Sequence, residues 1–458
     1  MNQELWQKIL EYNLDDPPTE YSFSVRLATE NFWTSDFTHR AILEYKKFMY
    51  LAATSDRMVS PSEVVDAVWH QHLVFTQSYQ DFCTLLGKQV QHVPNTHSRE
   101  EAERFKKARE HTRKLYAENF GSIPLDIWEC ASMFDSLELP KAKWKIRSFI
   151  IGGILAFALL IIPFYFLLAP LYRNIPNPDF LIWLSALAII LFVLLNQFND
   201  YQLKNVAIGF KENSFIQRLT SLEVIYLEKG ILHTVVTAAV NNLVNKGVIF
   251  IHPDFKMEVE KLDRVETIEH LQVVTELTHL QKAYYSVLST RLMNKPIFQR
   301  IEKSMDAFKK YFMKSAKFGK LFYINFISLA VLLMLALIRL ITGIIHHKPS
   351  DYIFILVLLL TGMIAYFLYR LTNLMCTHSI PSLYRDKLAK DSALASDLQW
   401  KYFLVGSLAL SQSFIPVVTH VEKQQSDGSG FSSDSSYGSS CGSSCGSSCS
   451  SCGGCGGD

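Results

Sequence analysis

Four long runs of apolar residues interrupt the mixed polar pattern of the chain. They cover residues 148–172, 180–199, 321–345 and 352–369. A transmembrane helix needs about 20 mainly apolar residues to cross a hydrocarbon core of about 30 Å, and each run is near or above that length. Only short connections separate the first run from the second and the third from the fourth. The pattern therefore predicts an all-α, multi-pass membrane protein with two pairs of transmembrane helices.

Basic residues gather before the first and third runs and after the fourth. In a protein with four spans, these positions all lie on one side of the membrane. The basic residues are Lys141, Lys143, Lys145, Arg147, Lys309, Lys310, Lys314, Lys317, Lys320, Arg370, Arg385, Lys387 and Lys390. Because Lys and Arg near span ends favour the cytoplasmic side, we expect both chain termini in the cytoplasm. Arg339 lies inside the third run, roughly 27 Å along the helix axis from Leu321. We expect its side chain to extend to the headgroups on the far side.

Residues 1–140 contain no such run, and their apolar spacing predicts a helical cytoplasmic domain. Ser35 is expected to cap its central helix. The stretch Ser60–Glu63 reads as a capping box that places a proline at the first position of the next helix. A further helix is expected to begin at Thr76 and to end at Gly87.

Residues 200–317, between the two pairs of spans, predict a second cytoplasmic, mainly helical module. A capping box at Thr220–Glu223 opens one helix, residues 232–246 form another, and residues 248–252 have the composition of a strand. This order is like that of a winged helix. The second helix carries few basic groups, so we expect protein contacts and no nucleic-acid binding. Residues 370–423 are expected to form a cytoplasmic helical segment.

The last part of the chain, residues 424–458, consists mostly of Ser, Gly and Cys and predicts a disordered tail. Its cysteines are Cys441, Cys445, Cys449, Cys452 and Cys455. Closely spaced thiolates can bind a soft metal ion such as zinc. Three interpretations stay open for this tail, namely reduced cysteines without a ligand, a bound metal ion, and thiol exchange or modification.

A second group of candidate residues lies in the N-terminal domain. Its members are Asp66, Trp69, His70, His72, Cys83 and His92. Residues two apart on a helix point about 200° apart, so His70 and His72 cannot bind one ion from an unbroken helix. Asp66 and His70 have the i, i+4 spacing that brings side chains together. The histidines are therefore structural, or His70 and His92 form a metal site with Cys83 as a third candidate, or the group is catalytic.

Composition supports a membrane protein. The 458 residues are 49% hydrophobic and 19% charged, with a mean hydropathy of +0.12. Soluble domains average roughly 25% charged residues. A formal net charge of +2 argues against nucleic-acid binding, and the scattered cysteines of the body exclude a disulfide scaffold.

Two resemblances follow from these motifs. The stretch VVDAVWHQHL, followed by Phe82-Cys83 and His92-Val93-Pro94, resembles the glycine-rich domain-containing protein family over residues 20–125. Residues 140–458 resemble an uncharacterised family of bacterial integral membrane proteins with a Gly/Cys-rich tail, although Ile225 and Lys229 depart from its pattern. The second resemblance implies a location in the bacterial inner membrane. Neither resemblance implies an enzymatic activity.

Two functions are compatible with these features. The first is a non-enzymatic, membrane-anchored interaction or scaffold protein, whose tail binds a soft metal or a partner. Its partners would be the lipid bilayer and proteins that contact the cytoplasmic domains. The second is a metal-dependent enzyme centred on Asp66, His70, His72 and His92. A transporter is disfavoured, because the runs contain too few ionisable residues to line a pathway.

Overall fold

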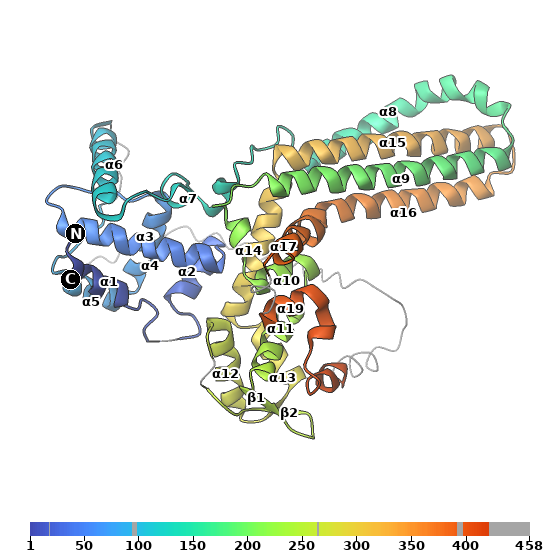
Figure 1. The fold of residues 1–458 in the computed structure, drawn as a ribbon. Helices are drawn as coiled ribbons and strands as arrows, with labels where there is room; N and C mark the ends of the chain where they lie inside the picture. The colour runs from blue at the N-terminus through green and yellow to red at the C-terminus, as the bar shows by residue number, and fades with distance from the viewer. Residues whose placement is uncertain (18, 94–98, 263–264, 392–396, 421–458) are drawn as a thin grey trace, which may run out of the picture.

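The computed structural model describes residues 1–17, 19–93, 99–262, 265–391 and 397–420. Within these ranges the fold is nearly all helical, with one small antiparallel sheet. Figure 1 shows an N-terminal group of helices, a long bundle that projects to one side, and a third group below the base of the bundle. The predicted tail, residues 424–458, lies outside the described residues, as do all five of its cysteines.

The N-terminal group packs its helices around an aromatic core that includes Phe37, Tyr45 and Phe82. Its elements are α1 (Gln3–Glu11), α2 (Phe23–Asn31), α3 (Ser35–Thr54), α4 (Glu63–Val74), α5 (Thr76–Leu86), α6 (Arg99–Phe120), α7 (Leu125–Trp128) and the 3-10 turn η1 (Met133–Leu137).

Two predicted helix starts in this group are shifted. The cap of α3 is Thr34, whose side chain accepts a hydrogen bond from the Phe37 amide, so the prediction of Ser35 is wrong by one residue. The cap of α4 is Ser62, which accepts from the Val65 amide. Pro61 therefore precedes the helix and does not occupy its first position. In both cases the capping hydroxyl accepts from the amide three residues later, one of the free amides of the first turn.

Four helices are long and apolar enough to cross a membrane. They are α8 (Ile146–Arg173), α9 (Asn177–Ile208), α15 (Ala316–Ile345) and α16 (Asp351–Leu374). Each extends beyond the predicted apolar run, because a helix continues into polar sequence until a breaker or cap ends it, as Gly209 ends α9. Helix α15 contacts α8, α9 and α16, so it holds the two pairs together (Figure 1).

Arg339 has protein partners that the sequence does not predict. Its side chain is buried and turns toward the connection between α8 and α9. It donates hydrogen bonds to the carbonyl oxygens of Tyr172 and, at 2.7 Å, of Ile175. The guanidinium also lies over the ring of Phe180, 5.1 Å from its centroid. Because backbone carbonyls at the end of a helix lack intrahelical donors, they supply the partners that this buried cation requires.

The third group combines the loop between the spans with the segment after α16. Its elements are η2 (Phe215–Arg218), α10 (Ser221–Lys229), α11 (Leu232–Asn245), β1 (Ile249–Ile251), β2 (Lys256–Val259), α12 (Ile268–Leu280), β3 (Ala283–Tyr284), α13 (Tyr285–Met293), α14 (Pro296–Met313), the π-helical turn η3 (Met375–Ser379), α17 (Ile380–Leu388), α19 (Leu398–Val405) and the 3-10 turn η4 (Gly406–Ala409).

The sheet in this group has the order β1-β2-β3 and is antiparallel, with Phe250 opposite Glu258 and Met257 opposite Ala283. Helix α10 contacts α11, α14, α17 and α19. The sequence predicts the module at 200–317 and the segment at 370–423 as separate units, but their helices pack together.

The N-terminal group is joined to the third group by packing and by a buried carboxylate. Helix α2 packs on α14. The capping box of α10 is formed by Thr220 and Glu223, as predicted. Glu223 accepts from the Thr220 amide at 2.7 Å and also from the amide of Ser35, at the start of α3, at 2.9 Å. Burial raises the pKa of the Glu223 carboxyl, while these two amides oppose the shift.

Candidate metal centre

Helix α4 carries two of the candidate residues on one face. The helix begins after Ser62, so Asp66 lies in its first turn and His70 lies one turn further along. This i, i+4 spacing brings the two side chains together. The Nε2 atom of His70 lies 3.8 Å from an oxygen of Asp66.

The third residue, His92, is brought to α4 by the chain that follows α5. Gly87 adopts a left-handed conformation with φ of 70° and ends the helix. The ammonium group of Lys88 then donates to the carbonyl oxygens of Ala52 and Ser55, each at 2.9 Å. The hydroxyl of Tyr79 donates to the carbonyl of Val90. These contacts fix an irregular segment against α3 and α5, and the segment delivers His92 to the start of α4.

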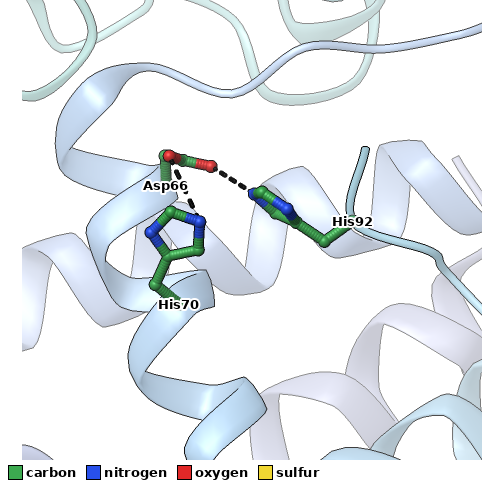
Figure 2. A group of neighbouring side chains, drawn as sticks. All are labelled: Asp66, His70 and His92. Atoms are coloured by element: carbon green, nitrogen blue, oxygen red, sulfur yellow. Dashed lines mark hydrogen bonds and ion pairs between the residues drawn. The ribbon is translucent and has the colours of Figure 1, made fainter. Parts of the chain in front are cut away.

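The three side chains converge (Figure 2). One ligand atom from each of Asp66, His70 and His92 lies within 4.8 Å of the other two. The Nε2 atom of His92 lies 3.1 Å from Asp66 Oδ1, and the two imidazole rings have centroids 4.4 Å apart. The side chain of His70 is 57% exposed and that of His92 is 18% exposed. Metal and ligands from solution therefore have access to the cluster.

A surface pocket of about 510 Å³ adjoins the cluster. Asp66 and His92 both line it, together with Trp69. Three arginines also line the pocket, namely Arg57, Arg104 and Arg109. These arginines are not among the residues that the sequence indicates, because they come from a loop and from α6 and converge only in the folded domain. The pocket lining thus combines cationic side chains with the carboxylates of Asp56, Glu63 and Asp66.

His72, the second histidine of the HxH pair, points away from the cluster into the core. Its side chain is fully buried. Its Nδ1 atom lies 2.8 Å from the Tyr45 hydroxyl and its Nε2 atom 3.1 Å from the Ser78 hydroxyl. Burial lowers the pKa of His72 to about 4 and raises that of Tyr45, so the two groups meet as a neutral pair. His72 therefore has the environment of a structural histidine.

Cys83 and Trp69 also differ from the three converging residues. Cys83 is buried in the core of the domain, and the structure does not bring it together with His70 and His92. Trp69 donates through Nε1 to the Tyr79 hydroxyl at 3.1 Å. The Trp69 ring packs at 4.7 Å on the ring of His92. Trp69 thus supports His92 by packing.

One family model matches the part of the chain that contains the cluster. Residues 26–117 match the family model described as UCP032817-like, an uncharacterised family. This range includes Asp66, His70 and His92. No curated protein and no solved structure matches the chain. The match lies inside the region for which the sequence predicts a resemblance to glycine-rich domain-containing proteins. It does not show that resemblance or a family with a Gly/Cys-rich tail.

Proposed function

We propose that the protein is a membrane-anchored metal-binding protein whose N-terminal helical domain holds a divalent transition-metal ion. The observation that carries this proposal is the convergence of Asp66, His70 and His92, with one ligand atom of each within 4.8 Å of the others. Four helices long and apolar enough to cross a membrane would provide the anchor.

The chemistry of the three groups supports a metal ion. Two imidazoles and one carboxylate are a ligand set used by zinc and by non-haem iron sites. Ligand atoms at about 2.0–2.2 Å from a tetrahedral ion lie roughly 3.3–3.6 Å from one another. The separations from Asp66 oxygens are 3.1 Å to His92 and 3.8 Å to His70. The two distances involve different Asp66 oxygens, Oδ1 toward His92 and Oδ2 toward His70, so the carboxylate faces both imidazoles.

Three protein ligands leave at least one coordination position for water or another ligand. The adjoining pocket is open to such a ligand, and its lining carries the cations Arg57, Arg104 and Arg109 as well as the carboxylates of Asp56 and Glu63. This open position is the observation that supports the second candidate function, a metal-dependent enzyme. With His72 in the core, that enzyme would use Asp66, His70 and His92 alone. A non-enzymatic interaction or scaffold protein would use the same ion to stabilise the domain.

Metal analysis of the detergent-purified chain tests the proposal. A form that ends at Gln425 removes the cysteine tail, so that its thiolates cannot contribute. We expect about one zinc or cobalt(II) ion per chain in this form, and a cobalt(II) absorption spectrum typical of nitrogen and oxygen ligands. His92→Ala should weaken binding by more than about tenfold, since even outer-shell changes cost 10–100-fold. His39→Ala is the matched control, because His39 is an exposed histidine of α3 outside the cluster.

Each outcome has a separate meaning. Metal that is retained by the shortened chain and lost in His92→Ala supports the site. Metal that is present only with residues 426–458 would move the function to the tail cysteines. No metal in either form would contradict both metal sites and would leave the interaction or scaffold function, to be pursued through partner proteins.

We also propose the orientation that the basic residues predict, with the N-terminal domain and the tail in the cytoplasm of a bacterial cell and the spans in the inner membrane. The lysines and arginines near the helix ends support it.

A further inference from the structure

A second pocket, of about 550 Å³, is lined by the C-terminal part of α9, the N-terminal part of α15 and Phe312 of α14. Helices α9 and α15 contact each other and run side by side in the bundle (Figure 1). The pocket is remote in sequence from the Asp66 cluster. An inference about it therefore does not depend on the metal site.

The pocket has an apolar end and a polar end. Phe198 and Ile324 line it on the side of the apolar runs, whereas Asn205 and Lys317 lie about seven residues further toward the polar sequence of α9 and α15. At 1.5 Å per residue the two ends are roughly 10 Å apart along the helix axes. This distance and polarity match the step from the acyl chains to the headgroup of a phospholipid.

The polar end carries positive charge. Lys317 and Lys320 both line the pocket, and their i, i+3 spacing places them on one face of α15. Their side chains are exposed. No carboxylate from the described residues lines the pocket. The ammonium groups therefore meet an incoming anion without a competing acid.

The polar groups at this end are available to a ligand. Within the described part of the chain, no ion pair or side-chain hydrogen bond engages Lys317, Lys320 or Gln202, which also lines the pocket. By contrast, Lys204 on the neighbouring turn of α9 pairs with Asp386 at 3.4 Å. Two ammonium groups and a side-chain amide can together bind phosphate oxygens.

We propose that this pocket is a binding site for an anionic phospholipid. The phosphate lies against Lys317 and Lys320, and an acyl chain packs along Phe198 and Ile324. Basic pockets between membrane helices bind anionic lipid headgroups. The apolar end selects a lipid over a free phosphate ion, because only a lipid buries hydrocarbon there.

Native mass spectrometry of the detergent-purified full-length chain, titrated with phosphatidylglycerol, tests the site. We expect the Lys317→Gln/Lys320→Gln double variant to bind this lipid at least about tenfold more weakly, because it removes both charged hydrogen-bond donors of the phosphate. The matched control is Lys310→Gln/Lys314→Gln. It removes the same charge from two exposed lysines of the same basic cluster that do not line the pocket. This control should bind as the unaltered chain does.

Phosphatidylcholine and glycerol 3-phosphate serve as further probes. We expect weak binding of the first, which has no net charge, and of the second, which has no acyl chain. Equal losses in the two double variants would show a diffuse electrostatic attraction and would overturn the proposal. Unchanged binding in Lys317→Gln/Lys320→Gln would overturn it as well. Glycerol 3-phosphate that competes as well as the lipid would replace it with a site for a soluble anion.

Discussion

Asn199 of α9 and Asn325 of α15 exchange two amide hydrogen bonds between the second and third spans. Each side-chain nitrogen donates to the other side chain's oxygen, at 2.9 and 2.7 Å. Both side chains are buried, and Asn325 also donates to the carbonyl of Leu321 at 2.8 Å. Polar pairs of this kind hold membrane helices together because each amide otherwise lacks a partner in an apolar surrounding.

We expect Asn199→Leu and Asn325→Leu each to lower the free energy of unfolding by about 0.6 kcal/mol and at most about 1.7 kcal/mol, the mean and the maximum for such pairs. Thermal unfolding in detergent measures this loss. The double variant should lose less than the sum of the single variants, because the first replacement already breaks the shared pair. Strict additivity would show that the two amides do not interact.

Arg339 should stabilise the packing of α15 against the connection between α8 and α9. Arg339→Met leaves the carbonyls of Tyr172 and Ile175 without their donor, and we expect a loss of about 1.5–3 kcal/mol, as for hydrogen bonds to charged groups. The control is Arg173→Met, an exposed arginine at the end of α8, which should change stability by less than about 0.5 kcal/mol. Unfolding in detergent compares the two, and similar losses would contradict the role of Arg339.

The two histidines of the HxH pair should affect different properties, His72 the stability of the protein and His70 its metal binding. His72→Ala should destabilise the protein by about 2–4 kcal/mol, because it leaves a cavity and removes the partner of Tyr45. His70→Ala should have almost no effect on stability but should weaken metal binding. Chemical unfolding followed by metal titration of the folded variants separates the two effects. A stable His72→Ala protein would contradict the structural assignment of this histidine.

A further histidine, His270 of α12, should make stability depend on pH. It is buried, and Gln399 contacts its Nε2 atom at 2.9 Å. Burial is the largest cause of the lowered pKa of His270, and the charge of Lys246 lowers this pKa further. Nearby carboxylates oppose the shift. These carboxylates are Glu269, Glu266 and Asp397. Between the lowered pKa and the ordinary value near 6.5, the unfolded chain binds more protons than the folded chain. Stability should therefore fall as the pH drops below about 6.5.

Unfolding temperatures at pH 7.5 and pH 5 test this linkage. We expect a smaller pH-dependent decrease in His270→Gln than in the unaltered chain, because glutamine does not titrate. The control is His279→Gln, an exposed histidine of the same helix, which should keep the full decrease. If His270→Gln keeps it too, the decrease arises from other groups.

The proposed orientation predicts where thiols react. In intact cells a membrane-impermeant maleimide should not label Cys441, Cys445, Cys449, Cys452 or Cys455, but it should label them after permeabilisation. Cys130 is replaced by serine for this test, since it is partly exposed, whereas Cys83 and Cys376 are buried. Lys348→Cys, in the connection between α15 and α16, provides the opposite control and should react in intact cells. Tail labelling in intact cells would refute the orientation.

Much of the fold is readable from local sequence. The apolar runs locate α8, α9, α15 and α16, because the bilayer sets a minimum length for a spanning helix. Thr220 and Glu223 mark the start of α10 for an equally local reason, since a cap bonds amides two or three residues away. Where two capping residues are adjacent, as at Thr34 and Ser35, sequence reasoning places the start one residue too late.

The sequence by itself therefore determined the nearly all-helical class, the four membrane-length helices and the pairing of Asp66 with His70 one turn later. Only the tertiary structure decided that His92 completes this cluster, that His72 and Cys83 lie in the core, and that Arg339 is buried against the α8–α9 connection. The physical reason is distance along the chain. Helix periodicity and capping act over a few residues, whereas the position of His92 depends on contacts that Lys88 and Tyr79 make with separate parts of the folded domain.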